Sequence, residues 1–398
     1  MTSVDTRTTR AAATATFVVF GGNGLVFASW AARIPAVTET LGLSSGQMGV
    51  FLLCIAVGSL LALPSAGWVV GRIGTASTLR GAGLVAAAAM AGVAVSLWTG
   101  SLVGLGASLF VYGIGIGLWD VVQNIEGADV EHRLGRTIMP QFHAAFSAGA
   151  FVGALIGAGL AGLGVGLPAH LLAVAVLALL LTLTASRFFL PHAASQQKAD
   201  AAPEGEKRDA AGRIAWLEPR TLLIGGIVLG ATLAEGAGND WIAKAAVDGL
   251  GTSEPVGALL FALFVAAMTV MRFVGGGVID RFGRVAVLRA SMAAVVAGLA
   301  LFVFGGHAIV VGAGAVLWGV GAALAFPIGI SAAADDPARA AARVSVVSTI
   351  GYLAFLAGPP LLGFVGDLVG IHRALLVICA PALLALLLAG AARPVQKQ

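Results

Sequence analysis

Two polar side chains lie four residues apart within an apolar segment of the first half of the chain. Asp120 and Asn124 occur in the stretch GIGLWDVVQNIEG, which otherwise has the character of a membrane-spanning helix. Residues at this spacing share one face of a helix, so their side chains can act together. An acid inside a bilayer costs a few kcal/mol unless it is paired, protonated or open to a water-filled cavity. We therefore predict that Asp120 carries a proton reversibly and that Asn124 contacts a substrate. The alternative is a structural ion pair with a neighbouring helix.

A second acid lies in a later apolar segment. Glu235 and Asn239 share a helix face in the stretch ATLAEGAGNDWIAK. We predict that Glu235 is the second proton-coupling residue and that Asn239 contacts substrate, with a structural role for the acid as the alternative. Asp240 and Trp241 follow at the expected outer end of the segment, where a tryptophan commonly anchors a helix at the membrane interface.

Other candidates are a cation, a histidine, an asparagine and two tryptophans within apolar segments. Arg272 lies well inside an apolar segment, so it must pair with a carboxylate, helix carbonyls or an anionic substrate group, and we expect it to act in gating or packing. His143 can titrate near neutral pH, so we predict a substrate contact, with an ordinary helix-interface role as the alternative. Substrate contacts are also predicted for Asn23, Trp30 and Trp318, although these tryptophan rings could equally pack within the protein.

The composition excludes an ordinary soluble protein. Of the 398 residues, 59% are hydrophobic and 11% are charged, whereas soluble proteins carry about 25% charged residues. We do not expect the protein to bind nucleic acid, because its basic residues are scattered in short loops and do not form a continuous basic surface. Cys54 and Cys379 lie in apolar runs and indicate neither a disulfide framework nor a metal site.

The apolar segments predict an all-α membrane protein with twelve transmembrane helices in two pseudo-symmetric six-helix bundles. At about 20 residues per crossing, twelve spans occupy roughly 240 residues and leave only short loops. The expected spans are approximately 12–33, 46–70, 79–99, 101–127, 140–164, 168–190, 221–243, 255–279, 285–306, 308–333, 344–366 and 373–392.

An internal repeat indicates where the bundles begin and end. The sequence GWVVGRIG at Gly67–Gly74 and the sequence GGVIDRFGR at Gly276–Arg284 begin 209 residues apart, which is close to half the chain. We predict an N-terminal bundle at 1–191, a polar cytoplasmic linker at 192–219 and a C-terminal bundle at 220–398. Repeated six-helix bundles are a recurring transporter design.

The positions of Lys and Arg predict the orientation. With a cytoplasmic N-terminus, 19 of the 23 basic residues fall on the inner side. The expected outer side holds only Arg33, Lys244 and Arg373. The chain is therefore expected to be a multi-pass protein of a bacterial inner membrane with both termini cytoplasmic.

The second repeat carries a charged loop motif at the inner end of its second span. Asp280, Arg281 and Arg284 occur in the pattern G-x-x-x-D-R-x-G-R. This pattern resembles the signature loop of the major facilitator superfamily, and the resemblance extends over essentially the whole chain through the twelve spans and central linker. It implies a gating latch formed by these three residues and Arg72; basic anchors on the inner face are the alternative. The first copy departs from the pattern, because Gly71 stands where the family has an acid.

The fourth and fifth spans give a finer resemblance. The pattern Gly-x-x-Asp-x-x-x-Asn around Asp120, followed by Gln141 and Phe142, resembles the fucose:proton symporter branch of the superfamily. It implies that Asp120 handles protons and sugar. The branch also has an acid shortly before the proline of helix 1, whereas the residues before Pro35 here are alanines and Arg33. A scheme using the same two acids is therefore excluded.

The fifth span contains Gly149, Gly153 and Gly157, a stripe of small residues that predicts close helix packing. The drug:proton antiporters of the superfamily have a glycine-proline signature on this helix. Here the Gly-Pro sequence occurs at Gly358-Pro359 instead, which counts against an antiporter.

These features together predict a secondary active transporter that moves a small polar, sugar-like solute by alternating access, coupled to protons. Drug or metabolite efflux by a proton antiporter is the alternative, and a non-transporting receptor is a third hypothesis. The nucleotide-binding pattern G-x-x-x-x-G-K-[ST] is not in the sequence, so a solute or ion gradient is the expected energy source. We expect a monomer in the lipid bilayer, without enzymatic activity, cofactor or metal.

Overall fold

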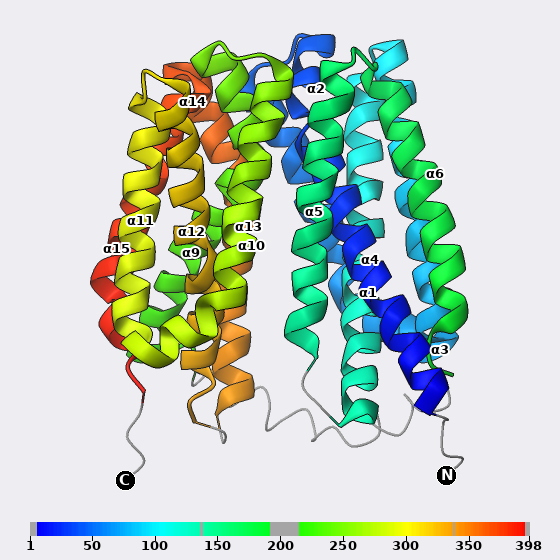
Figure 1. Ribbon diagram of the computed structural model, residues 1–398, viewed down its shortest axis with the longest axis vertical. Coiled ribbons are helices and arrows are strands. Elements are labelled where there is room, and N and C mark those ends of the chain that lie inside the picture. Colours follow the sequence, from blue (N-terminus) through cyan, green and yellow to red (C-terminus); the bar gives the residue numbers. More distant parts are fainter. Residues whose placement is uncertain (1–5, 136–137, 192–214, 337–338, 395–398) are drawn as a thin grey trace. The chain divides into compact units, whose positions relative to one another are not determined.

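The computed structural model describes residues 6–135, 138–191, 215–336 and 339–394, and its regular structure in these ranges is helical, as predicted. The first half contains α1 (Thr6–Ala31), α2 (Ile34–Leu41), α3 (Ser45–Thr99), α4 (Leu102–Leu134), α5 (Met139–Gly162), α6 (Leu167–Ala185) and the short helix η1 (Ser186–Phe188) (Figure 1). The second half contains α9 (Pro219–Lys244), η3 (Ala245–Gly249), α10 (Glu254–Phe282), α11 (Arg284–Phe304), α12 (Ala308–Ala333), α13 (Ala340–Val369), α14 (Ile371–Ala374), η4 (Leu375–Ile378), α15 (Cys379–Leu388) and η5 (Ala389–Ala392).

The number of membrane spans agrees with the prediction once α3 is considered as two helices. Among the described residues, 11 helical stretches are long and apolar enough to cross a membrane. One of them, Ser45–Thr99, has 55 residues, and at about 20 residues per crossing it is long enough to cross twice. It turns at Gly74, where φ is 81° and ψ is 164°. The helices are therefore consistent with twelve spans.

The internal repeat is visible in the backbone. Gly283 lies between α10 and α11 with φ 79° and ψ 155°, nearly the conformation of Gly74. The two glycines are 209 residues apart, the same offset as the repeated sequences. A positive φ is accessible to glycine at little steric cost, which explains why both turns use this residue.

The chain forms two compact units. Unit 1 consists of Met1–Leu43, Val50–Ala202 and Ser253–Ala262, and unit 2 consists of Ser44–Gly49, Pro203–Thr252 and Leu263–Gln398. The first residues of α3 therefore belong to unit 2, while the rest of that helix belongs to unit 1. The first residues of α10 belong to unit 1, while the rest of that helix belongs to unit 2. Most of the predicted linker 192–219 lies outside the described residues, so the proposed bundle boundaries remain a prediction.

The glycine stripe of α5 packs against α1 within unit 1. A side chain at Gly149 would collide with the backbone of Gly21, and one at Gly153 would collide with the backbone of Leu25. Towards the start of α5, Phe142 packs on Phe20 with ring centroids 5.5 Å apart. The predicted close packing of this helix is confirmed, and it fixes α5 beside the polar residues of α4.

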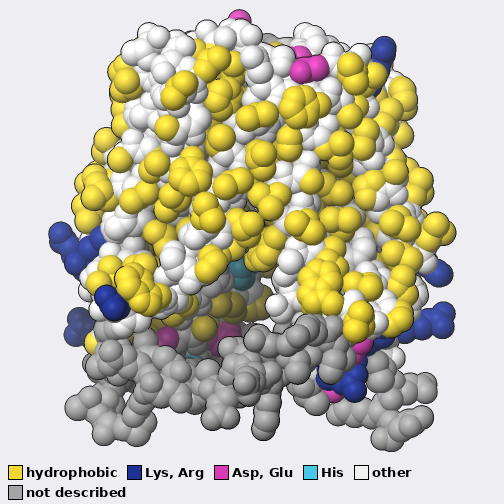
Figure 2. Space-filling model, turned by 180° about the vertical axis from the view of Figure 1, so that it is seen from behind, with side chains coloured by type: hydrophobic (Ala, Val, Ile, Leu, Met, Phe, Trp, Pro, Cys, Tyr) yellow, Lys and Arg dark blue, Asp and Glu magenta, His cyan; other side chains and the backbone are white. Residues whose placement is uncertain are grey.

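The surface is apolar over the helices. Figure 2 shows hydrophobic side chains over the middle of the visible face, while most Lys and Arg side chains lie towards its lower end. Val103 and Leu368 are 85% and 84% exposed, an arrangement that suits contact with lipid chains. The chain is a multi-pass membrane protein by the length and composition of these helices.

Candidate functional site

Asp120 lies at the centre of a small polar cluster on α4. Its side chain is exposed, and Oδ1 accepts a hydrogen bond from Nε2 of Gln123 at 3.0 Å. Nδ2 of Asn124 donates to the backbone oxygen of Asp120 at 2.8 Å and approaches Oδ1 at 3.4 Å. His143 of α5 is exposed and lies within electrostatic range of the Asp120 carboxylate. The structure therefore brings three predicted site residues together and adds Gln123, which the sequence interpretation omitted.

The predicted contacts on α1 lie within the protein. Asn23 is 3% exposed and Trp30 is 2% exposed. Both belong to a helix that packs against α4, α5 and α6 in unit 1. A substrate contact by either residue would require a rearrangement of this packing.

Arg272 and Glu235 form an ion pair in unit 2. Nη2 of Arg272 lies 2.8 Å from Oε1 of Glu235, with the two side chains 33% and 18% exposed. Nε of Arg272 also donates to the carbonyl of Ala323 on α12 at 3.4 Å. Asn239, one helical turn after Glu235, is partly exposed. A carboxylate is thus the main partner of the predicted intramembrane cation.

Trp318 is enclosed by packing. Its side chain has no exposed surface, and its indole Nε1 donates to the carbonyl of Ala234 at 3.0 Å. The rings of Phe264 and Phe302 contact it edge-on, with centroids 5.4 and 6.1 Å away. Because Ala234 directly precedes Glu235, Trp318 positions the part of α9 that carries the ion pair.

An arginine network lies at the end of α12. The carboxylate of Asp335 accepts hydrogen bonds from Nη1 of Arg284 at 2.6 Å and from Nη2 of Arg220 at 2.8 Å. Burial alone would raise the pKa of Asp335, but the hydrogen bonds and charges of these two arginines hold it below its usual value. Arg284 also donates to Oγ of Ser331 at 2.9 Å. The predicted gating residue Arg284 is therefore anchored inside unit 2.

The other predicted gating residues occupy helix ends. The guanidinium of Arg72 lies over the ring of Trp68 at 4.4 Å from its centroid. Asp280 is exposed, and Arg281 lies 5.3 Å from the ring centroid of Phe282. These residues lie beside the two repeated turns at Gly74 and Gly283.

Unit 1 contains an acid that the sequence interpretation missed. Glu126 on α4 is 2% exposed, accepts a hydrogen bond from the hydroxyl of Thr75 at 2.7 Å and accepts another from the amide of Leu190 at 2.7 Å. Glu126 and Asp335 are 209 residues apart, as are Thr75 and Arg284. Applying the repeat offset to the acids would have identified this site.

Charged side chains also make contacts at the opposite helix ends. In unit 1, Arg33 is 3% exposed; its Nε is 2.5 Å from Oε1 of Glu254, and its Nη2 donates to the carbonyl of Val165 at 3.1 Å. In unit 2, Asp367 accepts hydrogen bonds from the hydroxyl of Ser44 at 2.9 Å and the amide of Gly46 at 3.0 Å. These contacts hold the first turns of α10 and α3 within their respective units.

The acidic and histidine side chains do not suggest a metal centre. Groups of three or more His, Cys, Asp or Glu residues able to hold a metal ion were not found among the described residues. The polar contacts on α4 and α9 are instead hydrogen bonds and an ion pair.

Comparison with known proteins gives the family context. The model of the Major Facilitator Superfamily matches residues 237–398. An uncharacterised MFS-type transporter of Yersinia pestis is 31% identical over 379 residues, which cover 94% of this chain and 93% of that protein. The solved structure of the nucleoside transporter NupG is 15% identical, with a TM-score of 0.76, and the match covers 96% of this chain and 98% of NupG. The fucose:proton symporter FucP of E. coli, 14% identical, has a TM-score of 0.63 over 96% of this chain and 98% of FucP.

Proposed function

The chain belongs to the major facilitator superfamily of transporters, and on this premise we propose that it moves a small polar, sugar-like solute coupled to protons. Its relatives support transport, and the fold is common to several branches, of which the fucose symporters are one. The assignment to that branch is part of the proposal. Alternating access between two helical repeats is the expected mode of transport.

The observation that carries proton coupling is the cluster around Asp120. The carboxylate is exposed in the middle of an apolar helix, where a permanent charge is costly. Its neighbours Gln123 and Asn124 are neutral amides that can bond to the ionised or the protonated acid. Asp120 can therefore exchange a proton without losing every partner.

The same cluster supports a polar substrate. Amides and an imidazole offer both donors and acceptors, which match the hydroxyl groups of a sugar. Asn124 and His143 are the proposed substrate contacts of unit 1, and Asn239 is the proposed contact of unit 2. Asn23, Trp30 and Trp318 would take part only if the helices repack around the substrate.

Glu235 contributes to coupling through Arg272. While the acid is ionised, the ion pair stabilises this arrangement of α9 and α10. Protonation of Glu235 would remove its charge and break the ion pair. Arg272 would then bind another partner, because an unpaired cation within a membrane is costly. Arg72, Asp280, Arg281 and Arg284 complete the proposal as residues of an inner latch. We further propose a bacterial inner-membrane location, cytoplasmic termini and a monomeric transporter.

The test is transport by the purified chain in proteoliposomes. A thermal-shift screen with sugars, sugar acids, nucleosides and drugs first selects a ligand, since a ligand that binds only the native state raises apparent stability. Uptake of the selected radiolabelled compound is then measured with an inward proton gradient, with and without a protonophore. Accumulation that the protonophore abolishes supports the proposal, and uptake indifferent to the gradient contradicts proton coupling.

A further inference from the structure

Asp240 lies in a small pocket of unit 2 that is distinct from the Glu235 ion pair. It is five residues after Glu235 on α9, and its side chain is largely enclosed. Among the described residues, its carboxylate has neither a hydrogen-bond nor an ion-pair partner. A carboxylate without partners in an apolar part of a membrane protein is costly when ionised.

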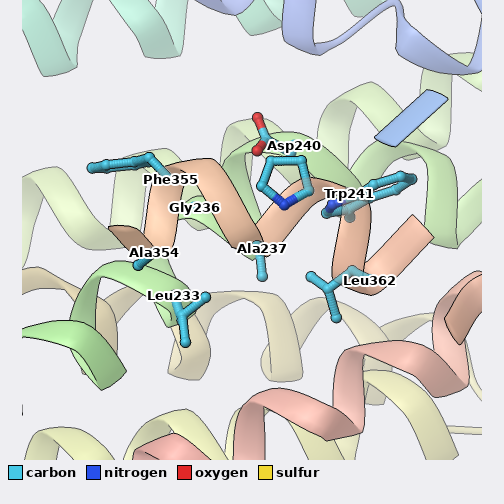
Figure 3. A pocket seen from close by; sticks show the side chains of 10 residues that line it. Leu233, Gly236, Ala237, Asp240, Trp241, Ala354, Phe355 and Leu362 are labelled. Atoms are coloured by element: carbon cyan, nitrogen blue, oxygen red, sulfur yellow. The ribbon is translucent and has the colours of Figure 1, made fainter. Parts of the chain in front are cut away.

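The pocket wall is apolar. Figure 3 shows Asp240 with Phe355 on one side and Trp241 on the other, while Leu233 and Leu362 lie below. The remaining lining consists of Ala, Gly and Pro residues of α9 and α13. The space is about that of one water molecule, so it accommodates a proton and excludes an organic substrate.

The opposite helix offers acceptors for an acid proton. Pro359 and Pro360 lie inside α13, and a proline has no amide hydrogen to donate to the carbonyl four residues earlier. The carbonyls of Phe355 and Leu356 therefore lack their usual helical donors. Phe355 lines the pocket itself. A protonated carboxyl group can donate to such a carbonyl, whereas a carboxylate cannot.

We propose that Asp240, in addition to Asp120 and Glu235, binds a proton and holds it against the carbonyls left free by the prolines of α13. Binding forms an O–H bond between the carboxylate and a proton taken from water, and release returns the proton to water. The role in transport rests on the proposed proton coupling. Unlike Glu235, Asp240 is not paired with Arg272.

The surrounding charges leave Asp240 free to respond to protons. On α9 and its extension η3, Glu235 pairs with Arg272, and Lys244 pairs with Asp248. The residues of α13 that line the pocket are not titratable, and the nearest charged residues after α13, His372 and Arg373, lie on the separate short helix α14. Burial therefore dominates the balance between its two forms.

The contacts of α13 with α3 give proton binding a structural consequence. The carbonyl of Pro359 is in close contact with Gly49 of α3, and Asp367 further along α13 holds Ser44 and Gly46. All of these residues belong to unit 2. A change in the hydrogen bonding of α13 at the prolines would thus reach the start of α3.

The first test is infrared spectroscopy of the full chain in lipid nanodiscs, which needs no substrate. An ordinary aspartic acid titrates near pH ~4. At about pH 6, wild-type protein should show a protonated-carboxyl C=O band that is absent from Asp240→Asn and fades as the pH rises. Asp248→Asn, altered at a neighbouring acid that is paired with Lys244, should retain the band. A spectrum unchanged by Asp240→Asn above about pH 5 overturns the proposal.

The second test is hydrogen exchange in peptides covering 352–362, corrected for the intrinsic pH dependence of exchange. In wild-type protein, deprotonation should speed exchange about fivefold, the effect of losing one hydrogen bond. Asn donates as the protonated acid does, so Asp240→Asn should stay protected at every pH, and Asp240→Ala should exchange fast at every pH. Identical pH profiles in all three proteins overturn the link to α13. Failure of wild-type proton-driven uptake would instead refute the proposed function and leave these two results unaffected.

Discussion

Equivalent acids in the two repeats are held by different chemistry. In unit 1, Glu126 accepts hydrogen bonds from the hydroxyl of Thr75 and from a backbone amide. In unit 2, Asp335 is paired with Arg284 and a second arginine. The acids are 209 residues apart, and so are Thr75 and Arg284. The repeat therefore keeps the position of the acid while a neutral donor in one unit becomes a cation in the other.

Burial explains the difference. The side chain of Glu126 is almost fully enclosed, whereas Asp335 is 10% exposed and its arginines are 23% and 30% exposed. A fully buried ion pair loses hydration on both partners, which often offsets its attraction. Neutral hydrogen bonds suit the enclosed site, and charge pairing suits the more open one. Substitutions of Glu126 and Asp335 should therefore show whether the stability of each site depends on a hydrogen-bond acceptor or on a negative charge.

The largest effect is expected for Glu126→Leu. The change leaves the amide of Leu190 and the hydroxyl of Thr75 without their acceptor in a buried place, which costs about 3 kcal/mol of unfolding free energy. Unfolding by SDS in mixed micelles measures the loss. A loss below about 1 kcal/mol would show that these hydrogen bonds are not needed.

A smaller loss is expected for Asp335→Asn. The amide keeps the size of the side chain but removes the charge that pairs with Arg284 and Arg220, and partial exposure limits the cost to about 1.5 kcal/mol. The loss should shrink in high salt because mobile ions screen these charges. A salt-independent loss would indicate packing instead of charge pairing.

Acid titration sharpens the role of charge at another acid of unit 2. Glu218 is bonded to Arg343 at 2.6 Å and to Arg339 at 2.8 Å, and these contacts, Arg343 foremost, lower its pKa to about 2. A lowered pKa stabilises the fold above the unfolded value of about 4.3, and this contribution is lost as the pH falls towards 2. Glu218→Gln should therefore be less stable than wild type by about 1 kcal/mol near neutral pH. Thermal unfolding against pH should show the difference closing in acid, and a constant difference would contradict the charge explanation.

The smallest effect is expected for Glu126→Gln. The amide oxygen still accepts from the amide of Leu190, and the amide nitrogen can donate to the hydroxyl of Thr75, so stability should change by less than about 0.5 kcal/mol. The comparison fails if this substitution is as costly as Asp335→Asn in the same SDS assay.

Much of the fold could be predicted from the sequence, because a helix that crosses a membrane requires a long apolar segment. Lengths of apolar sequence indicated the spans, and the repeated glycine turn at Gly74 and Gly283 indicated the symmetry. Asp120 and Asn124 share a helix face, as their four-residue spacing predicted, and Nδ2 of Asn124 donates to the backbone oxygen of Asp120. These features depend on local geometry, which a single sequence records.

Partners from distant segments were harder to predict. The sequence required a partner for Arg272 but could not choose Glu235 among the acids. The burial of the Trp318 side chain depends on its contacts with Phe264 and Phe302 of two other helices. Glu126 was missed because hydropathy does not distinguish an acid enclosed by helix packing from one at a helix end.

The most direct test of the central claim compares two transport assays on Asp120→Asn in proteoliposomes. The labelled compound is the ligand selected by thermal shift, and Asp129→Asn on the same helix, where Asp129 pairs with Arg133 at 3.3 Å, is the control. If Asp120 carries the coupled proton, Asp120→Asn should lose accumulation driven by a pH gradient while retaining exchange of labelled for unlabelled compound, and Asp129→Asn should retain both. Gradient-driven accumulation by Asp120→Asn at the wild-type level would contradict the claim.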